Sequence, residues 1–257
     1  MGWKPEWRPG FDRAAETLNL DLHMEDLAVA NLSSFTCVLP VDIKDHNLID
    51  LRRAEGISIC AISCPAGPRA LCADKLALNR KLIELGYGDH IPALLSGWNT
   101  DPLQLPIVLK PRWGGWGAGI QIITTSEQLE PHRAALAQSQ SFLQSLVQGA
   151  DEYAVHLLLK DGRLLYGAAI HHQMSAPNLV KGQINSPKRS LWCPEVPFVK
   201  LWVLMLHDIG LRDGTVCIDF RMRGTMPMVF EINPRMGGSL SGRPLDYLKT
   251  YLRHAGP

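Results

Sequence analysis

Apolar residues occur in short runs along most of the chain, and beyond Pro92 these runs predict strands rather than helices. The runs read as strands lie at residues 105–110, 119–124, 142–149, 152–159, 163–170, 215–222 and 228–235. The pair Asp161-Gly162 separates two of them and predicts an antiparallel hairpin, because Asp-Gly favours a two-residue turn. The second half of the chain is therefore expected to be rich in antiparallel sheet.

Apolar residues at helical spacing predict three helices between residues 74 and 209. Asp74 opens the first, over residues 74–86, and Gly86 ends it. Thr125 and Gln128 form a capping-box pattern that starts a second helix, expected to reach about residue 139. The third, over residues 196–209, is apolar enough to be buried.

The segment 35–63 shows a strand–helix–strand pattern. The apolar runs FTCVLPV (35–41) and ISICAIS (57–63) flank a polar, helix-compatible stretch at 45–56. This pattern predicts a short βαβ unit, which is too small for a full dinucleotide-binding domain.

Composition narrows the class of protein. The 257 residues contain 26 Lys and Arg against 25 Asp and Glu, a net charge of +1, which gives no bulk attraction to nucleic acid or to an anionic membrane. The sequence shows neither an apolar leader segment nor a run of about 18 apolar residues, so a cytoplasmic location is expected. The six cysteines form no C-x-x-C pair and are expected to be reduced and buried, without a zinc site.

The stretch IVLKPRWGGWGAGI, residues 107–120, places Lys110 at the end of an apolar run, directly before a glycine-rich loop. Glycines let backbone N–H groups converge on an anion and the lysine adds charge, so the pair suits a polyphosphate. A glycine-rich hairpin turn is the alternative. The chain has no G-x-x-x-x-G-K-[ST] loop, and a protein kinase places its glycine loop before the lysine, so both familiar phosphate loops are excluded.

A second candidate site combines Asp219 with Glu231 and Asn233. On neighbouring antiparallel strands Asp219 and Glu231 can face each other, and Glu231 and Asn233, two residues apart, share a face. Two carboxylates and an amide oxygen among apolar residues suit a hard divalent cation, Mg²⁺ by preference and Mn²⁺ as the alternative. Solvated carboxylates on a half-exposed sheet would be the other interpretation.

The order of these features resembles the ATP-grasp superfamily, of the carbamoyl-phosphate synthase, biotin carboxylase and D-alanine ligase type. The resemblance runs from about Cys72 to Ser239 and is carried by Lys110 with its glycine loop, by LQSLVQGADEY (143–153), and by EINPR (231–235) with an upstream Asp. It implies an α+β ATP-grasp fold, in which two α+β subdomains clasp ATP. A shortened α/β N-terminal domain (1–70) would precede the ATP-grasp domain (71–257), whose subdomains would be about 71–143 and 144–257.

The resemblance also implies roles for the nucleotide-binding residues. Lys75 and Lys110 would contact phosphates, and Glu152 would hold the ribose hydroxyls. The hinge would be Gln144, Ser145, Leu146 and Val147, with backbone groups of Ser145 and Val147 reading the adenine edge. The glycines of the expected lid are Gly114, Gly115, Gly117 and Gly119.

For the reaction itself, the resemblance implies that Asp219, Glu231 and Asn233 bind Mg²⁺ between phosphates, and that Arg235 acts with Lys110 as a catalytic residue. The expected activity is an ATP-dependent carboxylate–amine or carboxylate–thiol ligase that works through an acyl phosphate and releases ADP and phosphate. An ATP-grasp phosphotransferase, or a non-catalytic ATP-binding regulatory module, is the alternative.

Several assignments stay open at this level. Trp113 and Trp116 in the expected lid cover either the nucleotide or a partner. His171 and His172 are either an exposed pair or a substrate contact, and Lys181, Lys188 and Arg189 either bind an acidic substrate or only aid solubility. By resemblance alone, Gly237, Gly238 and Ser239 line the acceptor site. The expected partners are a small-molecule carboxylate and an amine, with a homodimer contact or a partner subunit as a way to complete the short N-terminal domain.

Overall fold

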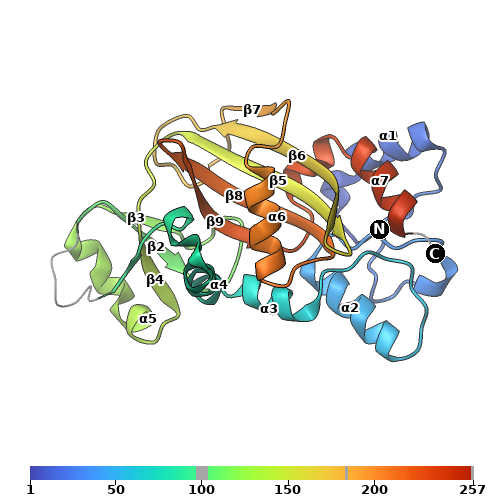
Figure 1. The fold of residues 1–257 in the computed structure, drawn as a ribbon, viewed down its shortest axis with the longest axis horizontal. Coiled ribbons are helices and arrows are strands. Elements are labelled where there is room, and N and C mark those ends of the chain that lie inside the picture. Colours follow the sequence, from blue (N-terminus) through green and yellow to red (C-terminus); the bar gives the residue numbers. More distant parts are fainter. Residues whose placement is uncertain (97–103, 183–184, 256–257) are drawn as a thin grey trace.

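Two antiparallel sheets form the framework of the molecule in the computed structural model, which describes residues 1–96, 104–182 and 185–255 (Figure 1). The smaller sheet has the strand order β1-β4-β2-β3, with β1 Leu94–Leu95, β2 Ile107–Pro111, β3 Gln121–Ile123 and β4 Ser141–Ser145. The larger sheet has the order β7-β6-β5-β8-β9, with β5 Asp151–Lys160, β6 Arg163–Gln173, β7 Arg189–Trp192, β8 Gly214–Arg223 and β9 Met226–Asn233. The predicted antiparallel character and the 152–170 hairpin are confirmed.

Helices surround the two sheets (Figure 1). They are α1 Arg8–Leu18, α2 Ile43–Ala54, α3 Ala66–Ala73, α4 Lys75–Leu82, α5 Arg133–Ala137, α6 Val199–Asp208 and α7 Leu245–Ala255. Helix α6 crosses one face of the large sheet, α5 lies beside the small sheet, and α1 packs against α7. The arrangement is an α+β fold, as predicted.

Strand alternation divides the large sheet into two faces. On β5, Val155, Leu157 and Leu159 join the core beneath α6, whose Trp202 and Met205 are buried. Because successive side chains point to opposite faces, the even-numbered residues of β5 face the other way. The first of them line the cavity described below, and Leu158 belongs to a second core under α7.

The N-terminal region differs from the βαβ prediction. Helix α2 forms, and Asp42 and Asp45 make a capping box at its start. The flanking segments 35–41 and 57–63 are extended but are not strands, because one backbone hydrogen bond, from Val38 N–H to the Cys60 carbonyl (2.8 Å), joins them in place of a ladder. The hydroxyl of Tyr251 completes the pairing, since it donates to the Val38 carbonyl and accepts from the Ile62 N–H, each at 2.9 Å.

All three predicted helices are shorter than expected, and the third, predicted over 196–209, is α6 Val199–Asp208. Helix α4 gives way to a π-helical turn at Ile83–Tyr87, in which Gly86 has a φ of 91°. The Thr125–Gln128 capping box is present, but it starts a 3-10 helix at Ser126–His132, and α5 follows only after Pro131. Proline removes a backbone donor and so prevents a continuous α-helix there.

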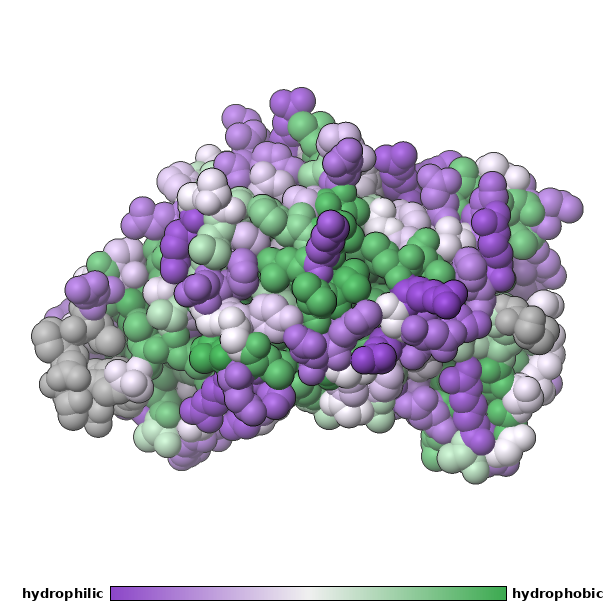
Figure 2. All heavy atoms as spheres, viewed as in Figure 1, coloured by the Kyte–Doolittle hydropathy of each residue, from purple (hydrophilic) through white to green (hydrophobic). Residues whose placement is uncertain are grey.

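The surface over α6 is apolar. Figure 2 shows hydrophobic residues gathered in the middle of the face that carries α6, with hydrophilic residues around them. Leu204 of α6 is 56% exposed and the preceding Phe198 is 38% exposed. Within the part of the chain that the structure describes, no helix is long and apolar enough to cross a membrane. All six cysteines lie in that part and are free thiols, but only Cys64, Cys72 and Cys217 are buried as predicted, while the other three are partly exposed.

Candidate active site

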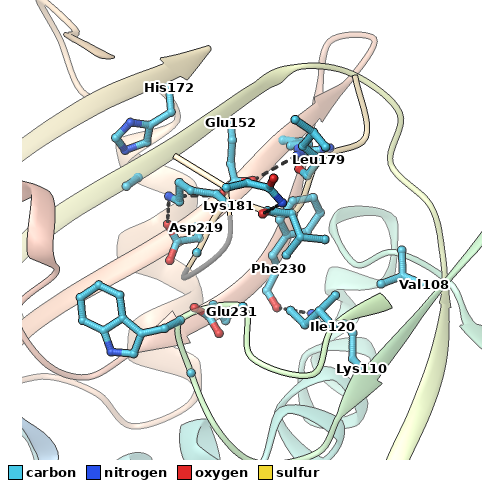
Figure 3. A pocket seen from close by; sticks show the side chains of 18 of the residues that line it. Val108, Lys110, Ile120, Glu152, His172, Leu179, Lys181, Asp219, Phe230 and Glu231 are labelled. Atoms are coloured by element: carbon cyan, nitrogen blue, oxygen red, sulfur yellow. Dashed lines mark hydrogen bonds and ion pairs between the residues drawn. The ribbon is translucent and has the colours of Figure 1, made fainter. Parts of the chain in front are cut away.

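A cavity of about 370 Å³ lies between the two sheets and contains almost all the residues singled out in the sequence. Of the predicted site residues it brings together Lys75, Lys110, Gly115, Gly117, Gln144, Ser145, Leu146, Val147, Glu152, Asp219, Glu231, Asn233 and Arg235. Gly114 and Gly119 belong to the same loop but do not line the cavity. Figure 3 shows side chains from both sheets converging on this space.

The floor of the cavity is a grid set by the register of the large sheet. Its cross-strand pairs are Glu152–His172, Ala154–Asp219, His156–Cys217, Asp219–Glu231 and Cys217–Asn233. Because residues directly opposite in an antiparallel pair point to the same side, all of these side chains share one face of the sheet. The predicted placement of Asp219, Glu231 and Asn233 on one face is confirmed.

A β-bulge in β9 shifts the pairing of β8 with β9 directly beside Asp219 and Glu231. Asp219 pairs with Glu231 and Phe220 with Val229, so Phe230 has no partner in the ladder. The Phe230 carbonyl instead accepts a hydrogen bond from Lys110 Nζ at 2.9 Å. The bulge thus turns a backbone oxygen toward the small sheet and fastens Lys110 across the cavity.

Lys181 occupies the centre of the acidic group (Figure 3). Its ammonium lies 2.9 Å from Asp219 Oδ1 and 3.1 Å from Glu152 Oε1. Burial alone would lower the pKa of Lys181, but the two carboxylates outweigh burial and raise it. Lys181 in turn holds the pKa of Asp219 below its ordinary value, against the effect of burial. The sequence placed Lys181 in a basic loop and did not foresee this contact.

The three predicted metal ligands form a compact set. The side-chain amide of Asn233 donates to Glu231 Oε1 at 3.0 Å and lies 3.5 Å from Asp219 Oδ2. Turning that amide by half a rotation would offer an oxygen in place of the nitrogen, which gives three oxygen donors of the kind that Mg²⁺ prefers. In the described residues, no three His, Cys, Asp or Glu side chains cluster closely enough to hold a metal ion. The two carboxylates and the amide still fit Mg²⁺ by the chemistry of their oxygen donors, because an amide is not counted in such a cluster. Their role as ligands stays a prediction.

Two lysines flank the acids on the side of the small sheet. Lys110 of β2 is 5% exposed, and burial lowers its pKa to about 8, although Glu231 acts in the opposite direction. Lys75 begins α4, where Asp74 caps the helix by accepting from the Ala77 N–H at 3.0 Å. Lys75 donates to the Gly114 carbonyl, and burial lowers its pKa as well. A buried ammonium group is costly without an anion beside it, and a bound phosphate would supply that anion, so this end of the cavity is suited to phosphate.

The glycine loop carries its two tryptophans to different places. Trp113 stacks on Arg112, with the guanidinium carbon 4.7 Å from the ring centre. Trp116, with a φ of 60°, reaches over one end of the cavity, where Arg235 lies 5.9 Å from its ring centre. A Cβ atom at Gly238 would lie 3.4 Å from the Trp116 ring. Trp116 therefore covers the Arg235 end of the site.

The loop that carries Lys181 also meets the glycine loop. A Cβ atom at Gly117 would lie 2.8 Å from the Lys181 carbonyl, and one at Gly182 would overlap the Trp116 carbonyl. Both positions require glycine for this close approach, and Gly117 also has a φ of 69°. The two loops thus close the cavity from the same side.

The hinge segment is only partly as expected. Gln144 is buried and donates to the Pro92 carbonyl at 3.0 Å, which joins β4 to the turn before β1. The Ser145 N–H is already bonded to the Ala93 carbonyl at 2.9 Å, so it is not free to read an adenine. Leu146 and Val147 follow the end of β4 and line the cavity, which leaves their backbone groups as the better candidates.

The Arg235 end of the cavity lies beyond Asn233. Arg235 donates to the Met236 carbonyl at 2.9 Å and lines the cavity beside Gly237, Gly238 and Ser239. His156 lies 2.8 Å from the Ser239 hydroxyl, and burial lowers the pKa of His156 to about 4. Among the side chains of this end, Arg235 supplies the positive charge, and His156 and Ser239 supply neutral hydrogen-bonding groups.

The histidine pair is divided by the sheet. His171 pairs with Asp151 at 2.7 Å and stacks on Tyr153 outside the cavity. His172 is 6% exposed, lines the cavity, and bonds Ser190 through Nδ1 at 2.8 Å. Burial lowers the pKa of His172 to about 4. Because adjacent strand residues point to opposite faces, only His172 can contact a ligand here.

Three residues of the site were not identified from the sequence in these positions. Besides Lys181, they are Arg112, which holds Asp74 with two nitrogens at 2.5–2.8 Å, and Arg221, which is buried beside Glu152 and lines the cavity. Strand alternation could have identified Arg221. It lies two residues after Asp219 on the same strand and so shares the cavity face with Asp219.

Comparison with known proteins agrees with this geometry. The family model of the ATP-grasp domain matches residues 72–239, and the chain belongs to the ATP-grasp family. No curated protein sequence matches it. The ATP-grasp fold expected from the sequence is confirmed.

Solved structures share the fold across nearly the whole chain. An L-amino acid ligase from Bacillus licheniformis superposes with a TM-score of 0.62 at 14% identity, over 98% of this chain and 73% of that one. A D-alanine–D-alanine ligase from Bacillus anthracis gives 0.58 at 14% identity, over 99% and 93%. A D-cycloserine synthetase gives 0.63 at 17% identity, over 96% and 94%. At these identities the likeness concerns the fold.

Proposed function

We propose that the protein is an ATP-dependent ligase that activates a small carboxylic acid as an acyl phosphate and joins it to an amine, releasing ADP and phosphate. The observation that carries the proposal is the convergence, in one cavity, of two lysines, a three-residue set of oxygen donors and Arg235. The structurally similar ligases named above support the same class of reaction.

The cavity provides separate places for the parts of the nucleotide. The apolar end, with Val108, Ile120 and Leu179, suits an adenine ring next to the backbone of residues 146–147. Glu152 lies where it can accept hydrogen bonds from ribose hydroxyls once Lys181 moves aside. Lys75 and Lys110 then face the phosphates, and their protonated forms are favoured by that anion.

Bound Mg-ATP would supply the phosphoryl group and a cation that neutralises it. The residues of this chain orient the components: Asp219, Glu231 and Asn233 hold the cation, and Arg235 holds the oxygens of the transferring group in a fixed fork. Trp116 covers this end and limits the access of water, which would otherwise hydrolyse an acyl phosphate. A primary amine is the expected nucleophile.

The experiment is a hydroxylamine trap. Pooled small carboxylic acids are incubated with the protein, ATP, Mg²⁺ and hydroxylamine, and hydroxamate and phosphate are both measured. An acyl-phosphate ligase gives hydroxamate with a particular acid, and Arg235→Lys gives much less. A stable phosphorylated product without hydroxamate would instead identify a phosphotransferase, and nucleotide binding without any turnover would identify a regulatory module.

A further inference from the structure

Arg221 is the most buried guanidinium next to the cavity, and four oxygen atoms surround it. Its side chain comes from β8 and is 4% exposed. Nη1 donates to the carbonyls of Gly149 at 3.1 Å and Val147 at 3.4 Å. Nη2 donates to Glu152 Oε2 at 3.3 Å and to the Leu179 carbonyl. One rigid fork thus touches the end of the hinge, the acid of the cavity and the segment that leads to Lys181.

These contacts hold one carboxylate oxygen of Glu152 at the wall of the cavity. The carboxylate is buried, with Arg221 on Oε2 and Lys181 on Oε1 at 3.1 Å. Burial raises the pKa of Glu152, and the two cations oppose that rise. Lys181 bonds Oε1 and bridges to Asp219, so it must leave that oxygen for a ligand to bond there, whereas Arg221 bonds Oε2 and can remain. Arg221 is therefore the group that can keep Glu152 aimed during binding.

The segment 178–182 is attached to the same point. Asn178 exchanges hydrogen bonds with Gly149, N–H to carbonyl at 2.8 Å and N–H to Oδ1 at 3.1 Å. Arg221 bonds the neighbouring Leu179 carbonyl, and Lys181 follows two residues later. A shift of Arg221 would move the hinge end and this segment together.

We propose that Arg221 is a positioning residue for the nucleotide: it presents Glu152 to the ribose hydroxyls and holds the turn 147–149 and the segment 178–182 around them. The proposal rests on the proposed function, because it assumes that Glu152 faces a ribose. The planar guanidinium of Arg221 is required for this role, because the single ammonium group of a lysine cannot make the same contacts in two directions.

The test compares nucleotides that differ only in the sugar. Affinities for ATP and for 2′,3′-dideoxy-ATP are measured by calorimetry with Mg²⁺, in the wild type, Arg221→Met, Arg221→Lys and a control, Arg163→Met, whose side chain is exposed on β6. Hydrogen bonds to a charged acid should make the wild type prefer ATP by roughly tenfold or more. Both Arg221 variants should reduce the preference to about threefold or less, while Arg163→Met keeps it.

A merely structural role gives a different result. General loosening would weaken both nucleotides alike and leave their ratio at the wild-type value, and that result overturns the proposal. If Arg221→Met fails to fold, Arg221→Lys, which retains the charge, decides by the same ratio. A wild type that binds ATP without preferring it over the dideoxy analogue overturns the role of Glu152 together with that of Arg221, and a wild type that binds no nucleotide overturns the proposed function as well.

Discussion

Replacing Lys181 with methionine tests whether its ammonium holds the nucleotide-free site together. The substitution keeps the length and volume of the side chain but removes the charge that lies 2.9 Å from Asp219 and 3.1 Å from Glu152. Both carboxylates are buried, with side-chain exposures of 15% and 7%. Breaking a buried pair on one side costs about 3–5 kcal/mol. Arg221 still faces Glu152 and Asn233 still faces Asp219, so we expect about 2–3 kcal/mol.

The pH dependence of this loss has a defined sign. The folded-state pKa of Asp219 is lowered by Lys181, so its contribution is present above the unfolded pKa and disappears as the pH falls through the folded value. The pKa of Lys181 is raised, so its contribution persists below its ordinary value of 10.5 and is lost only in strong alkali. The difference in unfolding free energy between wild type and Lys181→Met should therefore be largest near neutral pH and should close in acid.

The assay is urea unfolding at neutral and acid pH, with Lys188→Met as the matched control, because Lys188 is in the same loop and exposed. A second measurement adds Mg²⁺ without nucleotide. In the wild type, Mg²⁺ can bind only after Lys181 has left the carboxylates, which costs about 2–3 kcal/mol of binding free energy. Lys181→Met does not bear this cost and should bind Mg²⁺ roughly 30- to 150-fold more tightly. Equal stability of the two lysine variants at neutral pH, or equal Mg²⁺ affinity in wild type and Lys181→Met, would refute the reasoning.

Three further outcomes are expected. ATP binding should weaken as the pH rises through about 8, where Lys110 loses its proton. Lys110→Ala should lose this pH dependence and about 1.5–3 kcal/mol of nucleotide affinity, both measured by calorimetry. An unchanged affinity would show that Lys110 does not bind phosphate. Glu231→Gln should abolish turnover but change the urea stability of the nucleotide-free protein by no more than about 1 kcal/mol, since the new amide oxygen still accepts from Asn233. A larger loss would make Glu231 a structural residue. Arg235→Lys should keep ATP affinity within a few-fold and reduce turnover and hydroxamate roughly a hundredfold, and a variant with near wild-type kcat would contradict the oxyanion role.

The strands of the second half could be predicted because their alternation is dictated by a buried face. The same alternation placed Asp219, Glu231 and Asn233 together, and the register confirms it. The N-terminal strands could not be predicted correctly, since an apolar run shows that a segment is buried but not what pairs with it. The segments 35–41 and 57–63 pack partly under α7 and partly against α2. The Tyr251 hydroxyl, which lies far away in sequence, bonds both of them.

The site residues that the sequence missed share a physical reason. Lys181 and Arg221 act through contacts between elements that are distant along the chain, so their spacing in the sequence does not show which groups they hold. Ser145 shows the converse. It lines the cavity at the end of β4, but the bond from its N–H to the Ala93 carbonyl depends on a turn outside the motif. Motif spacing predicts which residues meet, and only the fold shows which of their hydrogen-bonding groups are already used.

The second core under α7 bears on how this chain can be divided. Met1, Trp7 and Phe11 from the beginning of the chain pack in that core with Met236 and Tyr247 from its end. A fragment starting near residue 71 would therefore expose the apolar face of α7 and the side chain of Met236, which follows Arg235. For expression or for domain transplantation, the first seventy residues behave as a cofolding partner of the site rather than as a detachable module, and cutting there is expected to yield aggregated protein.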